Sequence, residues 1–136
     1  MASTRGRHGA RRLLLQALYQ EQIAGHDIAE LIEQFTARDE FAAVDGDYFH
    51  AVLRDVLQRT AALDEIIDGF LDRPIQQLDP VEHALLWIGA SELSSQDDVP
   101  ANVIINEAVE LAKEFGGQDS YRYINAVLDK ASKSLR

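Results

Sequence analysis

Four arginines stand close together at the start of the sequence, in the stretch RGRHGARR. They are Arg5, Arg7, Arg11 and Arg12, and no acidic residue occurs before Glu21. A guanidinium group can pair with a phosphate through two parallel hydrogen bonds, so a cluster of arginines suits contact with a nucleic acid. The whole chain carries 13 basic and 23 acidic side chains, a net charge of −10 at pH 7. The basic cluster is therefore a local exception in an acidic protein.

Two further side chains follow the arginines at helical spacing. Gln16 lies four residues after Arg12, and Tyr19 lies three residues after Gln16. A helix that begins near Ala10 would present a cation, an amide and an aromatic ring along one edge. This combination suits single-stranded RNA, whose exposed bases accept stacking and hydrogen bonds. The alternative is a disordered polar tail with Tyr19 packed in the core, and the residues alone favour neither interpretation.

A second basic and aromatic group lies late in the chain. Arg122 and Tyr123 fall in the first turn of the expected last helix, where an anion could meet free backbone amides. Lys130, Lys133 and Arg136 have a simpler explanation, because cations near a helix C-terminus interact favourably with its dipole. If the first and last helices packed side by side, both groups would form one patch, and the acidic remainder would confine nucleic acid to it.

No motif in the sequence indicates a catalytic site. The four histidines, His8, His26, His50 and His83, lack metal-ligand spacing such as HExxH, and the phosphate-binding pattern GxxxxGK does not occur. The chain has no cysteine, which excludes a disulfide, a thiolate metal site and cysteine redox chemistry. We therefore expect no catalytic residue, no metal and no cofactor, and an enzyme is disfavoured.

The elements that must position these side chains are helices. Apolar residues recur at helical spacing almost throughout, and no long stretch alternates with a period of two. We expect an all-α fold of about seven helices, as a single domain over 1–136 with two packed halves, about 10–73 and 79–135, after an arginine-rich N-terminal arm. No apolar run approaches the roughly 20 residues of a membrane-spanning helix, so the expected protein is cytoplasmic and does not contact a membrane.

Local signals mark several helix ends. Asp45 or Asp47 can cap one helix, and Asp79 followed by Pro80 has the pattern of an N-cap with proline at the first helical position. Gly116-Gly117 should stop the next-to-last helix, since glycine accepts the left-handed conformation that is common just past a helix end.

Two stretches of the sequence carry a family pattern. The first, VPANVIINEAVELAKEFGGQDSYRYINAVLDK, runs from Val99 to Lys130. With its Val-Pro, INEA(I/V)ELAK, FG, a serine and (I/V)N(G/A)VLDK, it resembles the C-terminal segment of the NusB family of bacterial transcription antitermination factors. The second, ARRLLLQALYQ, resembles the family's arginine-rich opening followed by QALY. The resemblance covers essentially the whole chain.

This resemblance implies a function without catalysis. Family members are all-helical, bind the boxA element of nascent RNA, and pair with a small-subunit ribosomal protein called NusE in this role. The pair joins other Nus factors on RNA polymerase during synthesis of ribosomal RNA. The alternatives are a helical protein-interaction module without specific RNA binding, and the NusB-like domain of a ribosomal RNA methyltransferase. Both a monomer and a homodimer stay open.

The resemblance also implies two surfaces. Glu82 matches an acidic position on the protein-partner surface. Trp87 stands where a polar or basic residue is expected, so it is either a core tryptophan or a hydrophobic anchor for the partner. The residues that the resemblance places on the RNA surface are Arg7, Arg11, Arg12, Gln16, Tyr19, Asp119, Ser120, Arg122 and Tyr123.

Overall fold

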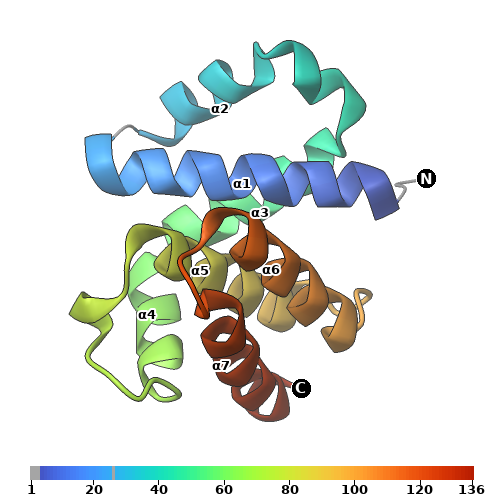
Figure 1. Ribbon diagram of the computed structural model, residues 1–136. Coiled ribbons are helices and arrows are strands. Elements are labelled where there is room, and N and C mark those ends of the chain that lie inside the picture. Colours follow the sequence, from blue (N-terminus) through green and yellow to red (C-terminus); the bar gives the residue numbers. More distant parts are fainter. Residues whose placement is uncertain (1–3, 26) are drawn as a thin grey trace. The chain divides into compact units, whose positions relative to one another are not determined.

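The computed structural model describes residues 4–25 and 27–136, and their helices can be followed in Figure 1. The α-helices are α1 (Thr4–Ala24), α2 (Ile28–Thr36), α3 (Gly46–Gln58), α4 (Thr60–Asp68), α5 (Pro80–Ser95), α6 (Ala101–Phe115) and α7 (Ser120–Leu135). Two short 3₁₀-helices, η1 (Asp39–Ala43) and η2 (Ile75–Gln77), lie in the connections. The described residues contain seven α-helices and no strand, which confirms the predicted all-α class. None of these helices is long and apolar enough to cross a membrane.

The chain divides into two compact units, Met1–Gln58 and Arg59–Arg136, which we call unit 1 and unit 2. The expected division at Arg73–Asp79 falls inside unit 2 instead. Proline at position 74 does follow α4, but α4 packs against α5 and α7 and so shares their core. A break in the chain and a boundary between packed units are therefore different features here.

In unit 1, helices α1, α2 and α3 enclose an aromatic core. The rings of Phe35 and Phe49, both fully buried, lie 6.0 Å apart between their centres. The side chain of Asp27 accepts a hydrogen bond from the Glu30 amide and caps α2. Of the two predicted caps for α3, Asp45 has this role, because its carboxylate accepts a hydrogen bond from the Tyr48 amide at 3.1 Å.

Helix α1 begins at Thr4, well before the expected start at Ala10, so the arginine cluster lies in a helix and not in an arm. The glycines of the cluster serve packing. The Gly6 carbonyl accepts a hydrogen bond from the Asp45 amide, and a Cβ added at Gly9 would lie 2.6 Å from Val44 Cγ1. Helix α1 ends before Gly25, whose φ of +69° is the left-handed conformation that glycine adopts at no steric cost.

In unit 2, α5 is the central helix and contacts α4, α6 and α7. Every residue from 84 to 93 is buried, which explains why this stretch is apolar on all sides. Asp79 is the N-cap and Pro80 the first helical residue, as predicted, and Glu82 completes a reciprocal capping box with Asp79. Gly89 allows α7 to approach closely, since a Cβ there would lie 2.6 Å from Leu128 Cδ2.

Helix α6 ends at Gly116 as predicted, but the expected conformation is wrong. Gly116 has a φ of −85°, whereas the left-handed residue is Asp119 with a φ of 67°, directly before α7. Space explains the glycine, because a Cβ at Gly116 would lie 2.7 Å from the Ala112 carbonyl oxygen and 2.9 Å from Ser120 Cβ. The tight passage from α6 to α7 thus places the start of α7 beside the end of α6.

Arg136 does more than interact with the dipole of its own helix. Its guanidinium donates hydrogen bonds to the carbonyl oxygens of Leu93 at 2.9 Å and Gln96 at 2.7 Å, and also to those of Glu92 and Val99. Carbonyls at a helix C-terminus have no partner within the helix. Arg136 supplies that partner for the end of α5.

Candidate nucleic-acid interface

Two of the four arginines face α3. Arg7 Nε lies 3.5 Å from an Asp45 carboxylate oxygen, and its guanidinium lies 4.6 Å from the centre of the Tyr48 ring. The Arg11 guanidinium lies 5.3 Å from the same ring, and Arg11 is only 2% exposed. Arg11 was expected to bind phosphate, but its position makes it a packing residue of unit 1. Arg7 is half-buried and shares its charge with Asp45.

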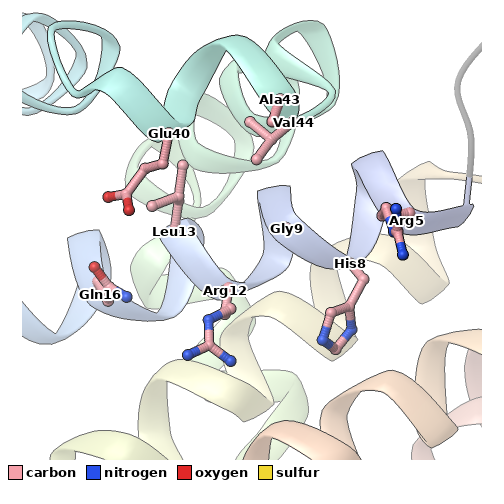
Figure 2. A pocket seen from close by; sticks show the side chains of 9 residues that line it. All are labelled: Arg5, His8, Gly9, Arg12, Leu13, Gln16, Glu40, Ala43 and Val44. Atoms are coloured by element: carbon pink, nitrogen blue, oxygen red, sulfur yellow. The ribbon is translucent and has the colours of Figure 1, made fainter.

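The opposite face of α1 lines an open pocket of about 310 Å³ (Figure 2). Its walls come from two elements, α1 and the η1 region. The lining residues are Arg5, His8, Gly9, Arg12, Leu13, Gln16, Glu40, Ala43 and Val44. Figure 2 shows His8 and Arg12 projecting from the same side of α1. The pocket therefore combines cations, an amide and apolar wall atoms on one helix face.

Gln16 is held in this pocket by a residue from the α2–η1 connection. Arg38 Nη1 donates a hydrogen bond to Gln16 Oε1 at 2.7 Å. The same guanidinium lies 4.0 Å from the centre of the Phe35 ring and 3.4 Å from Glu40 Oε1. Gln16 is thus an oriented side chain and not a loose one.

Tyr19 completes the predicted edge of α1. It is 44% exposed, which excludes the alternative that it packs in the core. Arg12, Gln16 and Tyr19 therefore share one face of α1, as their spacing predicted. Neither His8 nor Arg5 was among the residues predicted for the RNA surface, and the structure places both in this pocket. Their spacing to Arg12 was a usable signal, but it required the helix to extend through Gly6 and Gly9.

At the start of α7, the side chain of Ser120 forms a hydrogen bond with the side chain of Glu82. The Ser120 hydroxyl donates a hydrogen bond to Glu82 Oε2 at 3.0 Å, and both residues are buried. Glu82 was expected on a partner surface and Ser120 on the RNA surface. Each instead points to the other and joins the first turns of α5 and α7.

Asp119 and Arg122 lie outside this link. Both side chains are well exposed, and Arg122 Nε lies 3.8 Å from Asp119 Oδ1. Arg122 Nε also donates a hydrogen bond to the Tyr121 hydroxyl at 3.0 Å. This hydrogen bond is the largest of the causes that raise the pKa of Arg122. Arg122 is thus a surface cation at the N-terminal end of α7.

Tyr123 is covered by a residue that the sequence did not suggest. The Arg73 guanidinium lies 4.0 Å from the centre of the Tyr123 ring, within cation–π range. Arg73 Nε also donates a hydrogen bond to Asp72 Oδ1 at 3.0 Å, which lowers the pKa of Asp72. Burial raises the pKa of the Tyr123 phenol. The Arg73 guanidinium therefore covers a face of the Tyr123 ring, and the Arg73 side chain is itself 39% exposed.

Trp87 belongs to the core. It is 6% exposed, and its indole N–H donates a hydrogen bond to Asp64 Oδ1 at 2.7 Å. His83 Nε2 lies 2.7 Å from the same oxygen, with its ring 4.1 Å from Trp87. Because a carboxylate only accepts, His83 Nε2 carries a proton. Of the two alternatives for Trp87, the structure supports the core residue and not the exposed anchor.

Among residues 4–25 and 27–136, no group of three or more His, Asp or Glu side chains is placed to hold a metal ion. His26, one of the four histidines weighed as a metal ligand, lies outside the described residues.

The chain is similar in sequence to the proteins of a known family. The profile of the NusB family matches residues 8–133. The chain is 49% identical over 130 residues to the transcription antitermination protein NusB of Alcanivorax borkumensis, covering 96% of this chain and 87% of that protein. The corresponding protein of Hahella chejuensis is 46% identical over the same shares.

Solved structures have the same fold. The chain matches T. maritima NusB with a TM-score of 0.85 at 25% identity, over 98% of this chain and 93% of that one. It also matches, by fold, a chain in a crystal structure of the antitermination factors NusB and NusE in complex with dsRNA. That TM-score is 0.82 at 24% identity, over 97% of this chain and 99% of the other. By profile, by close relatives and by fold, this chain belongs to the NusB family.

Proposed function

We propose that this protein is a transcription antitermination factor that binds boxA RNA together with the ribosomal protein NusE. In this role it would join other Nus factors on RNA polymerase and promote processive transcription of ribosomal RNA operons. Relatives that share nearly half of its residues are named as transcription antitermination proteins. A protein of the same fold has been crystallised with NusE and dsRNA.

The observation that carries the RNA part of this proposal is the outer face of α1. Arg5, His8 and Arg12 supply positive charge or hydrogen-bond donors, Gln16 supplies an amide, and Tyr19 supplies an exposed ring. Phosphates accept the first kind of contact, and unstacked bases accept the other two. Arg5 and Arg12 place two cations on this face of an otherwise acidic chain, which favours RNA here over the acidic remainder.

A second contact at the start of α7 is part of the proposal. Arg122 offers an exposed cation, and the Arg73–Tyr123 stack offers a planar guanidinium. Guanidinium planes stack on bases as aromatic rings do. Asp119 lies beside Arg122 and limits its charge, so this group contributes more to base contact than to phosphate binding.

A salt titration with two RNAs tests the proposal. Binding of a boxA oligonucleotide and of a scrambled control is measured by fluorescence anisotropy, with and without NusE, over a range of salt. We expect preference for boxA that NusE strengthens, and Arg12→Ala should reduce the steepness of log K against log salt by about 0.7. Arg54→Ala, which removes an exposed arginine of α3, is the matched control and should leave the slope unchanged.

The opposite result has an equally definite meaning. Equal, weak binding to both RNAs, unaffected by NusE, would contradict the RNA proposal. Tight binding of NusE alone would then support the alternative, a helical protein-interaction module. Sedimentation at the same protein concentrations separates a monomer from a homodimer, so that self-association is not mistaken for a loss of RNA binding.

A further inference from the structure

We propose that Arg38 is a positioning residue that fixes Gln16, so that Gln16 presents its amide N–H groups to a nucleobase in the pocket between α1 and η1. This inference rests on the proposed RNA-binding function. It adds a specificity-determining pair, Arg38 and Gln16, at that site.

The hydrogen bond between Arg38 and Gln16 fixes the orientation of the Gln16 amide. Arginine has only donors, so the atom of Gln16 that lies 2.7 Å from Arg38 Nη1 must be the amide oxygen. The oxygen is thereby turned toward Arg38, and the edge of the amide that is directed away from Arg38 is the NH₂ group, which donates. In Figure 2 the amide nitrogen of Gln16 lies on the side of Arg12. An isolated glutamine could flip its amide and offer either edge; this one is held in one orientation.

The side chain of Arg38 is itself held in place by its neighbours. Its guanidinium rests on the fully buried Phe35 ring at 4.0 Å and pairs with Glu40 at 3.4 Å. Its backbone amide donates to the Phe35 carbonyl, and its own carbonyl accepts a hydrogen bond from the Phe41 amide. A preorganised donor loses less entropy when its ligand binds, so the cost of ordering Gln16 is already met in the free protein.

The composition of the pocket favours a base over a phosphate next to Gln16. Leu13, Ala43 and Val44 provide apolar wall atoms for the face of a planar ring. Glu40 lies in the same lining, and its carboxylate repels a phosphate group. The NH₂ edge of Gln16 favours a carbonyl oxygen or an unprotonated ring nitrogen over an exocyclic amine.

The test compares three single variants and one double variant on boxA RNA and on a set of single-base substitutions of it, in the presence of NusE. Arg38→Met keeps a side chain that packs on Phe35 but donates no hydrogen bond. We expect it to reduce discrimination at one base position about fivefold, the effect of one hydrogen bond, and to leave the salt slope unchanged. Arg38→Lys keeps a donor and should restore most of the discrimination. Gln16→Ala should lose discrimination at the same position, and adding Arg38→Met to it should cost nothing more.

Gln34→Ala is the matched control. It removes the neighbouring hydrogen bond between α1 and α2, in which Gln20 Nε2 donates to Gln34 Oε1 at 2.8 Å, without touching Gln16. It should leave base discrimination intact.

Three results would overturn the inference. The first is a fall of the salt slope by about 0.7 in Arg38→Met, because it would make Arg38 a direct phosphate contact. The second is an additive loss of discrimination in the double variant. The third is unchanged base discrimination in Arg38→Met. If the unmodified protein fails to prefer boxA at all, the proposed function fails first, and this inference with it.

Discussion

Single residues on α1 differ in what their neighbours allow them to do. Arg7 and Arg11 are one helical turn apart and lie over the same Tyr48 ring, whereas Arg12 lies in the pocket on the opposite face. A buried arginine contributes through its apolar stem and its ring contact, and a surface arginine contributes through its charge. Sequence composition cannot separate these two uses, because Arg11 and Arg12 are adjacent and identical in type.

Replacing each of these two arginines should therefore give different results. Arg11→Ala should lower the free energy of unfolding by about 1–2 kcal/mol, since it removes a buried stem and its contact with Tyr48. Its salt slope for RNA binding should not change. Arg12→Ala should cost less stability and should lower the slope. Urea unfolding and the RNA salt titration measure the two effects, and a lowered slope in Arg11→Ala would contradict this division of roles.

A titration shift should reveal the Arg73 contact. The hydrogen bond from Arg73 lowers the pKa of Asp72 below its ordinary value of 3.8. Arg73→Ala should raise the pKa of Asp72 back toward that value, as measured by NMR of the carboxyl carbon. Because the pKa is lowered in the folded state, the pair stabilises the fold above the ordinary pKa, and this contribution is lost as the pH falls through the lowered value. An unchanged Asp72 titration in Arg73→Ala would show that the hydrogen bond does not form in solution.

At the scale of elements, local signals predicted most helix ends and missed those that depend on distant contacts. The caps at Asp45 and Asp79 depend on residues within one turn, so the sequence suffices for them. The start of α1 was predicted too late, because glycine is a poor helix former and the contacts of Gly6 with Asp45 and of Gly9 with Val44 are visible only in the structure. The boundary between units was misplaced for the same reason, since only packing assigns α4 to unit 2.

The close approach of α5 and α7 gives a sharp test of packing. Gly89→Ala should gain about 1 kcal/mol of helix propensity but lose about 1–3 kcal/mol to overpacking, because the new methyl group meets the buried Leu128 side chain at 2.6 Å. We expect net destabilisation, measured by thermal unfolding. Gly69→Ala is the control, since the nearest atom to its Cβ is at an ordinary 3.5 Å.

A double variant checks the cause. Leu128→Ala removes the atoms that the new methyl group would meet. Gly89→Ala should then cost less in the Leu128→Ala background than in the original chain. Equal costs in both backgrounds would show that Leu128 is not the source of the destabilisation.

At the scale of the whole molecule, charge is unevenly distributed along the chain. Residues 1–12 hold four of the 13 basic side chains and no acidic one, so the rest of the chain carries a net charge of −14. Exposed charges of one sign repel a polyanion over roughly 8–10 Å at ordinary salt. Under the proposed function, the acidic remainder would act against unspecific RNA and leave the outer face of α1 as the favourable one.

Reversing part of this surface should reduce specificity more than it increases affinity. In Glu65→Lys/Asp68→Lys, two exposed acidic residues of α4 become cations. Scrambled RNA should bind more tightly, while boxA RNA should gain less, so the ratio of the two dissociation constants should move toward one. Glu65→Gln/Asp68→Asn should have an intermediate effect. Loss of the ratio without any gain for scrambled RNA would indicate damage to a contact surface instead.

The candidate site was partly accessible from the sequence. Spacing along α1 correctly grouped Arg12, Gln16 and Tyr19, since neighbours on one helix face are fixed by the helix itself. The partners from other elements, Arg38 on Gln16 and Arg73 on Tyr123, had no such signal. Each pairs residues that are many positions apart in the sequence, and nothing in their types alone points to the contact.

The buried indole of Trp87 gives unit 2 an intrinsic fluorescence signal that needs no added label. Trp87 is the only tryptophan in the chain, and Asp64 of α4 and His83 of α5 both contact it. Indole emission shifts with the polarity around the ring, so the intrinsic fluorescence of the protein reports on one place, the junction of α4 and α5. A partner protein without tryptophan that loosens or tightens this junction would change the emission spectrum of the unmodified protein. The same titration that measures binding would then also locate its effect.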